Sequence, residues 1–184
     1  TDGNTVLNAD ASVDGEVNIQ QDTLTNSSGY TLEANSITGP GSTFANVGTA
    51  KVGTDVTVDT VTNDGTLNVA GNVTSDVDDF TLGTNGELVL DGTGNQDVTA
   101  AVEASANGDG SIKVNNTGIG SVTTFSGGIG DNTKKVGSLT VTQGDTLLDT
   151  DASIDSVIVD ADTLTNNSSF TLTANNITGA AGTF

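Results

Sequence analysis

The 184-residue sequence predicts an all-β fold: a parallel β-helix (β-solenoid) of roughly 7–9 coils with few or no helices. Three observations support this prediction. Aliphatic residues alternate with Thr, Asn or Asp, a short glycine motif recurs along the chain, and a long block begins to repeat near the C-terminal end. Alternation with a period of two places one face of each segment in a core. Short units that cannot bury a core alone are typical of solenoids.

The long repeat joins the two ends of the sequence. Residues 22–39, "DTLTNSSGYTLEANSITG", match residues 162–179, "DTLTNNSSFTLTANNITG". We therefore expect residues 1–44 to begin a repeat of about 140 residues, 45–144 to complete it, and 145–184 to begin the next as the cognate of 1–44. We expect one continuous solenoid. We also expect a piece of a longer protein, because the sequence starts at Thr1.

Within this block, strands are predicted wherever apolar residues alternate with polar ones. Clear examples are residues 55–61 ("DVTVDTV"), 65–71 ("GTLNVAG") and 137–143 ("GSLTVTQ"). Val, Ile and Thr suit a pleated surface, whereas Gly and Asn suit the corners between strands. Residues 97–106 ("DVTAAVEASA") have the Ala and Glu content of a helix, but we expect none there.

The glycine motif reads Gly-x-aliphatic-x-aliphatic. It starts at Gly65, Gly86, Gly110 and Gly137, at spacings of 21, 24 and 27 residues. Each unit has room for two or three short strands separated by Asn, Asp and Gly turns. Stacked units would align their inward Val, Leu and Ile residues in one continuous column.

The alternative fold is a string of immunoglobulin-like β-sandwiches. Such domains run to about 100 residues and favour a large buried aromatic residue such as Trp. This sequence has no Trp, one Tyr and five Phe. A narrow core of small aliphatic residues needs no large aromatic centre, so the solenoid is favoured.

The composition is strongly acidic, with 24 Asp and Glu against 4 Lys and Arg and a net charge of −20. This charge argues against nucleic acid and anionic membranes as partners. The sequence has neither Cys nor His, which excludes disulfides and thiolate or imidazole metal sites. No apolar run reaches the roughly 20 residues that span a bilayer, so we expect no membrane insertion. We expect an extracellular or bacterial cell-surface location.

Two acidic segments are candidate Ca²⁺ sites. One holds Asp76, Asp78 and Asp79, and the other holds Asp149 and Asp151. Residues two apart in an extended segment point the same way, so such pairs could share Ca²⁺ with backbone carbonyls. The spacing of an EF-hand or a calcium-binding nonapeptide is missing, which favours acidic turns that face water. We expect no other cofactor.

Paired carboxylates also raise the remote alternative of a β-helical carbohydrate-active enzyme. Catalysis on sugars usually needs cationic, aromatic and proton-transferring side chains, and this sequence has no Arg, His or Trp. Tyr30 has Phe170 as its cognate, which indicates a packing residue. We therefore expect no enzymatic activity. Lys134 and Lys135 are interpreted as a solvated loop, with docking onto an acidic neighbouring copy as the alternative.

Residues 122–148, "VTTFSGGIGDNTKKVGSLTVTQGDTLL", resemble the passenger regions of bacterial autotransporters, and most of all those of rickettsial outer-membrane surface antigens. The phrases "ITGPGSTF" and "ITGAAGTF" are similar to a recurring phrase of those regions. The resemblance implies a β-helical surface stalk, used for adhesion or as a coat, and it carries over no catalytic residue.

These observations together predict a structural repeat module of a large bacterial cell-surface or extracellular protein. Such a module would form a stalk, a surface-layer coat or a self-assembling fibre. Its partners would be other copies of itself or adjacent repeats of the same chain. The alternative is a Ca²⁺-dependent adhesin module that binds a host-surface or glycan ligand.

Overall fold

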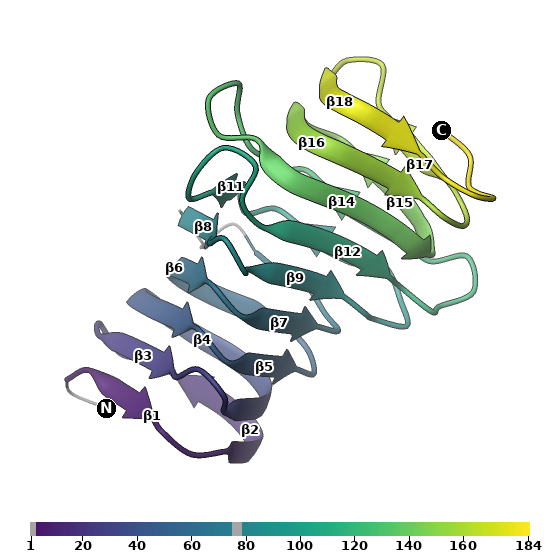
Figure 1. Ribbon diagram of the computed structural model, residues 1–184. Coiled ribbons are helices and arrows are strands. Elements are labelled where there is room, and N and C mark those ends of the chain that lie inside the picture. Colours follow the sequence, from purple (N-terminus) through teal and green to yellow (C-terminus); the bar gives the residue numbers. More distant parts are fainter. Residues whose placement is uncertain (1–2, 75–78) are drawn as a thin grey trace.

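The computed structural model describes residues 3–74 and 79–184, and Figure 1 shows short strands stacked in successive coils. No helix occurs in these residues, and strands occupy residues 96–98 and 102–104 in the segment with helix-like composition. The strands are β1 (Thr5–Leu7), β2 (Ala11–Asn18), β3 (Thr23–Asn26), β4 (Thr31–Asn46), β5 (Thr49–Val52), β6 (Val56–Asn63), β7 (Thr66–Val69), β8 (Asp79–Leu82), β9 (Glu87–Leu90), β10 (Gln96–Val98), β11 (Val102–Ala104), β12 (Ser111–Asn115), β13 (Val122–Phe125), β14 (Val136–Gln143), β15 (Asp145–Leu148), β16 (Ala152–Val159), β17 (Leu164–Asn166) and β18 (Leu172–Thr178).

All pairings between these strands are parallel, and strands inside a sheet, such as β5 and β7, pair with strands of the coils before and after them, whereas edge strands such as β1 and β18 pair on one side. The chain forms a β-solenoid of about eight turns, with its two termini at opposite ends (Figure 1). The predicted parallel β-helix is therefore confirmed. The alternative of immunoglobulin-like sandwiches is wrong, because those domains are built from antiparallel sheets.

Inward side chains stack in three columns along the solenoid, one for each strand position of a coil. Column 1 consists of Thr5, Leu24, Phe44, Val61, Phe80, Val102, Ile129, Ala152 and Leu172. Column 2 consists of Ala11, Leu32, Ala50, Leu67, Leu88, Ile112, Leu139, Val157 and Ile177. Column 3 consists of Val17, Ile37, Val56, Val73, Val98, Phe125, Leu148 and Asn166.

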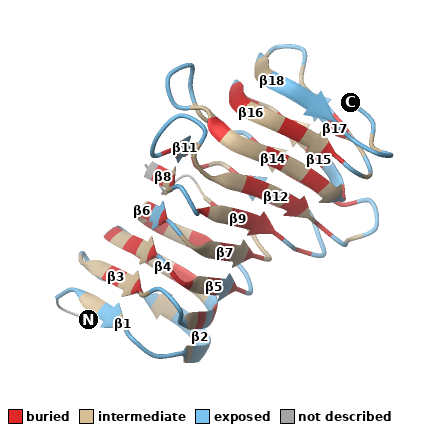
Figure 2. Ribbon diagram, viewed as in Figure 1, coloured by how far each residue is buried: buried red, intermediate tan, exposed pale blue. Residues whose placement is uncertain are grey.

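The columns form one continuous hydrophobic core, visible in Figure 2 as buried positions that recur from coil to coil. Phe44, Phe80 and Phe125 are fully buried and are the largest side chains in it. The columns thus hold aromatic rings beside the predicted Val, Leu and Ile. The narrow interior does accept aromatic rings, distributed over two of the three columns.

Three of the four motif glycines, Gly65, Gly86 and Gly137, lie where the chain turns against backbone atoms, and Gly110, with a φ of +72°, lies against the Leu82 side chain. A Cβ atom on Gly65 would lie 2.0 Å from the carbonyl oxygen of Gly48, and one on Gly86 would lie 2.1 Å from the carbonyl oxygen of Asn63. Both distances are far below van der Waals contact. The motif therefore marks a corner at which two coils approach too closely for any side chain.

Residues of the second copy of the block do not lie in the same columns as their cognates in the first copy. Ala11 lies in column 2, but its cognate Ala152 lies in column 1. Likewise, Val17 lies in column 3 and its cognate Val157 lies in column 2. One block therefore spans six and two-thirds coils, and its second copy is rotated about the solenoid axis by one third of a turn relative to the first.

Candidate functional site

Polar side chains at the corners connect each coil to the next. The carboxylate of Asp10 accepts a hydrogen bond from the backbone N–H of Thr31 at 2.8 Å, and its cognate Asp151 accepts one from Thr171, also at 2.8 Å. Because the carboxylate lies in one coil and the N–H in the following coil, the bond fixes their relative position. The two copies of the block therefore make the same contact although they lie on different faces.

A second corner contact is conserved between the two copies even though the residue type changes. Asn4 accepts a hydrogen bond from the backbone N–H of Thr23 at 3.1 Å, and its cognate Asp145 accepts one from Thr163 at 3.1 Å. Both side chains offer an oxygen at the same position, so Asn and Asp are interchangeable here. Many Asp and Asn residues of this acidic sequence thus serve as acceptors between coils.

Inside the core, three buried asparagines form a ladder along the solenoid. The side-chain amide of Asn26 donates to the side-chain oxygen of Asn46 at 2.9 Å, and Asn46 donates in the same way to Asn63 at 2.8 Å. All three side chains are buried. Each amide also donates to a backbone carbonyl one coil further on: Thr49, Thr66 and Glu87, at 2.9, 3.0 and 3.0 Å.

The sequence contains a recurring pattern from which this ladder could have been predicted. The segments "TLTN", "TFAN" and "TVTN" end at Asn26, Asn46 and Asn63 and follow one another at coil spacing. Asn at a strand end is normally interpreted as a turn residue. Its recurrence at the same place in successive coils indicated that these side chains stack on one another.

The structure describes only some of the residues predicted to bind Ca²⁺. Asp76 and Asp78, and the side chain of Asp79, lie outside the residues that the structure describes. Asp149 accepts a hydrogen bond of 2.5 Å from the side-chain amide of Asn167, and Asp151 bonds the Thr171 N–H as described above. In the described part of the chain, no group of three or more acidic residues could hold a metal ion. The calcium site stays a prediction.

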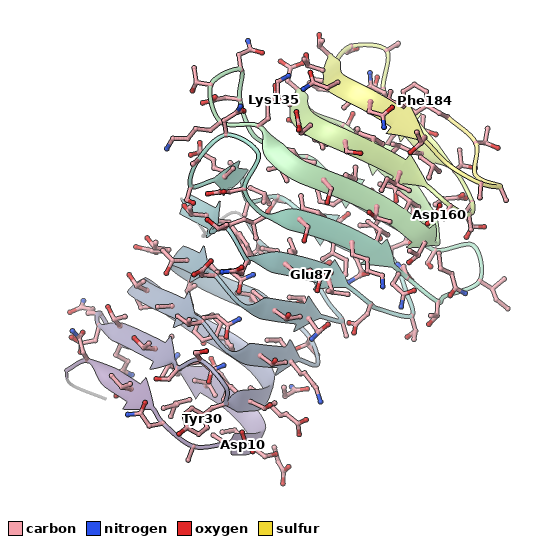
Figure 3. All side chains as sticks on the ribbon, viewed as in Figure 1. Asp10, Tyr30, Glu87, Lys135, Asp160 and Phe184 are labelled. Atoms are coloured by element: carbon pink, nitrogen blue, oxygen red, sulfur yellow. The ribbon has the colours of Figure 1, made fainter. Side chains whose placement is uncertain are left out.

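Several other charged groups are engaged locally on the surface. The side-chain hydroxyl of Thr133, with the backbone N–H groups of Thr133 and Lys134, donates to Asp131 and holds the pKa of that carboxyl below its usual range. A 2.9 Å ion pair with Glu33 raises the pKa of Lys51. The ammonium group of Lys135 donates to the side chain of Asn175 at 3.0 Å, within the same molecule. Asp131 and Lys135 lie in the same loop, between β13 and β14, where Figure 3 labels Lys135, whereas Glu33 and Lys51 lie in β4 and β5.

Tyr30 lies at an exposed corner and not in the core, with 36% of its surface exposed. Its carbonyl oxygen accepts from the Asn26 side chain at 3.5 Å, and the carbonyl of its cognate Phe170 accepts from Asn166 at 3.1 Å. The two copies of the block therefore share this hydrogen bond to the backbone, although the side chain changes from Tyr30 to Phe170. That Tyr30 is a packing residue stays a prediction, since its side chain is only partly buried.

Inward residues become exposed at the two ends of the solenoid. Ile177 in the last coil is 44% exposed and Phe184 is 63% exposed, whereas their cognates Ile37 and Phe44 are fully buried. Figure 2 shows the same change: β1, β2 and β18 are mostly intermediate or exposed, while the middle strands carry the buried positions. In the two end coils, these positions thus lack the neighbouring coil that covers their cognates.

In comparisons with known proteins, no family model, curated protein or solved structure matches the chain. Among the described residues, no helix is long and apolar enough to cross a membrane. The candidate functional surfaces are thus the stacking edges themselves, held by corner carboxylates, the asparagine ladder and the three columns.

Proposed function

We propose that the chain is a structural repeat module of a large bacterial cell-surface or extracellular protein, in which stacked coils form a stalk, a coat or the wall of a fibre. Its mechanism is mechanical. Parallel ladders and continuous inward columns resist bending, and acidic corners keep the exterior hydrated. We infer that it has no catalytic role. The likeness of residues 122–148 to autotransporter passengers, and the high acidity, support the surface assignment.

The observation that carries this proposal is the repetition of inter-coil contacts between the two copies of the block. Asp10 and Asp151 hold Thr31 and Thr171 in the same way, one third of a turn apart. Adding a block therefore adds coils without requiring a new type of interface. Length can grow by duplication while the cross-section stays constant, which is the property that a stalk or fibre needs.

A lengthened chain tests this property. In it, residues 1–145 are followed by residues 5–184, which adds one block in phase. Small-angle X-ray scattering should show a maximum dimension greater by about 32 Å, given about 4.8 Å per coil, and an unchanged cross-sectional radius. A thicker particle, or two bodies joined by a flexible linker, would contradict the proposal. Antibody labelling of intact producing cells tests the location, and labelling only after permeabilisation would contradict it.

A further inference from the structure

We propose that Asn85 is a site of spontaneous covalent modification, at which the chain converts an asparagine into aspartate and isoaspartate. The sequence has two Asn-Gly pairs, at residues 85–86 and 107–108. Asparagine is a thermolabile residue, and a following glycine has no side chain to hinder its backbone nitrogen. Both asparagines are exposed, so their different hydrogen bonds decide which one reacts. The change needs no enzyme and does not depend on the scaffold function.

The reaction uses only the chain and water. The backbone nitrogen of Gly86 gives up its proton to the solvent and attacks the side-chain carbonyl carbon of Asn85. A new C–N bond closes a five-membered imide, and the bond to the side-chain nitrogen breaks, so that ammonia leaves. Water then opens the ring. Opening at the side-chain carbonyl gives aspartate, whereas opening at the backbone carbonyl gives isoaspartate, in which the main chain runs through the former side chain.

At Asn107, both reacting groups are held by the following coil. The side-chain oxygen of Asn107 accepts a hydrogen bond from the backbone N–H of Lys135 at 3.1 Å. The N–H of Gly108 donates to the carbonyl oxygen of the same Lys135 at 2.9 Å. Both of these bonds between coils must break before the Gly108 nitrogen can reach the Asn107 side chain. The fold therefore protects this pair.

At Asn85, only the attacking nitrogen is held. The N–H of Gly86 donates to the carbonyl oxygen of Gly83 at 2.9 Å, within the same turn. The backbone N–H of Asn85 donates to the carboxylate of Asp64 at 3.0 Å, but in the described part of the chain its side chain has no hydrogen-bond partner. Ring closure here requires the loss of one local bond, which a turn can open without separation of the coils.

The corner around Asn85 also leaves room for the reaction. A surface hollow of about 410 Å³ opens there, and its lining includes Asp64, Thr66 and Asn85. The Asn85 side chain can rotate within this hollow, and water reaches the imide through the same opening. Both the attack and the hydrolysis are therefore accessible at this pair.

Isoaspartate would disturb a corner in which the backbone is tightly packed. It lengthens the main chain directly before Gly86, whose Cβ position lies 2.1 Å from the Asn63 carbonyl oxygen. The next residue, Glu87 (Figure 3), accepts a hydrogen bond of 3.0 Å from the buried Asn63 amide through its carbonyl oxygen. A longer main chain moves this carbonyl away from the asparagine ladder. The new carboxylate also lies beside Asp64 and adds to a net charge of −20.

Peptide mapping by mass spectrometry tests the proposal. The folded chain is incubated at mildly alkaline pH, and conversion at each asparagine is followed by the mass increase that accompanies replacement of an amide by a carboxylate. Asn85 should convert about fivefold faster than Asn107, which is the factor that corresponds to one further hydrogen bond. In concentrated urea the two pairs should convert at similar rates, because the fold no longer holds either of them.

Asn85→Gln removes the proposed site, and Asn107→Gln is the matched control. After incubation, an isoaspartyl methyltransferase should methylate Asn85→Gln much less than Asn107→Gln, while any isoaspartate formed at Asp-Gly pairs gives the same background in both. Circular dichroism checks that both variants are folded. Equal conversion of the two asparagines in the folded chain, faster conversion of Asn107, or no conversion of Asn85 would overturn the proposal.

Urea unfolding tests the effect on the corner. The isoaspartate form, isolated by chromatography, should unfold at a lower urea concentration than Asn85→Asp, which has the added charge without the longer main chain. Equal midpoints would contradict the predicted displacement of the Glu87 carbonyl from the ladder. None of these results bears on the scaffold function, which the lengthened chain tests separately.

Discussion

The buried side chains of Asn46 and Asn63 are joined by a 2.8 Å hydrogen bond, in which the Asn46 amide nitrogen donates to the Asn63 oxygen. Asn46 also accepts from Asn26 and donates to the Thr66 carbonyl, so it is the centre of a polar chain that crosses three coils. A buried amide in this position stabilises the fold only while all of its partners are present.

Asn46→Ala should therefore lower the free energy of unfolding by about 2–4 kcal/mol, because it leaves the Asn26 amide and the Asn63 oxygen without this partner inside the core. Urea unfolding followed by circular dichroism measures the loss. Asn68→Ala is the control, since Asn68 makes one long contact of 3.5 Å to the Ala50 carbonyl. Equal losses in the two variants would show that the ladder contributes nothing specific.

The repeat supplies a matched pair of aromatic residues. Phe44→Ala should cost about 3–5 kcal/mol, because Phe44 is fully buried and its removal leaves a cavity. Phe184→Ala changes the cognate residue, which is 63% exposed, and should cost less than about 1 kcal/mol in dilute solution. Thermal and urea unfolding compare the two variants. Similar losses at both positions would contradict the assignment of columns.

The corner glycines give a prediction that depends on backbone spacing alone. Gly65→Ala should destabilise the fold by about 2–4 kcal/mol, because its Cβ would lie 2.0 Å from the Gly48 carbonyl oxygen and the coils would have to separate. Gly94→Ala should be neutral or slightly stabilising, since nothing lies within 4 Å of its Cβ position. Unfolding midpoints in urea decide between the two effects, and a tolerated Gly65→Ala would mean that the coils are not in contact there.

Substitutions of Asp151 distinguish a structural role of its carboxylate from a metal-binding role. If its carboxylate serves as the acceptor for the Thr171 N–H, Asp151→Asn should keep the stability, and Asp151→Ala should lose about 1 kcal/mol. Melting is then expected to be the same with and without a chelator. Lower stability of Asp151→Asn in Ca²⁺, together with melting that depends on the chelator, would instead support the calcium-dependent adhesin.

Asp131 gives a prediction for pH. Its pKa is held below its usual range, first by the Thr133 hydroxyl and then by backbone N–H groups. A depressed pKa in the folded state means that its contribution is present above the unfolded pKa and is lost as pH falls through the folded value. Thr133→Val should raise the pKa of Asp131 towards its usual range in an NMR titration. Thr142→Val, which removes a hydroxyl bonded to the Val114 carbonyl, should leave it unchanged.

The alternation of residues such as Leu67 and Val69 was sufficient to predict inward columns, because a strand has only two faces. The reason for the glycine motif was not visible, since Gly65 is required by a carbonyl oxygen of a different coil. Similarly, Asn46 looks like a turn residue until its neighbours above and below are known. Local patterns thus predicted the strands and their stacking, whereas contacts between coils decide which polar and aromatic residues are buried.

The rotation of one third of a turn between the two copies could not be predicted from the sequence, for a related reason. The block length of a repeat is visible in the sequence, but the number of coils it contains depends on the length of every corner. Val157, the cognate of Val17, therefore lies in column 2 and not in column 3, where a whole number of coils would place it.

Cross-linking of paired cysteines tests this stacking most directly, because the chain has no cysteine of its own. Thr140 and Ile158 are partners on adjacent coils, at the spacing of about 4.8 Å that a disulfide can bridge. Thr140→Cys combined with Ile158→Cys should oxidise readily to an intramolecular disulfide. Ser126→Cys combined with Ile158→Cys should not, although Ser126 would be the neighbour of Ile158 if the block spanned six whole coils. Efficient cross-linking of the second pair and not the first would mean that the block spans whole coils and that the columns described here are wrong.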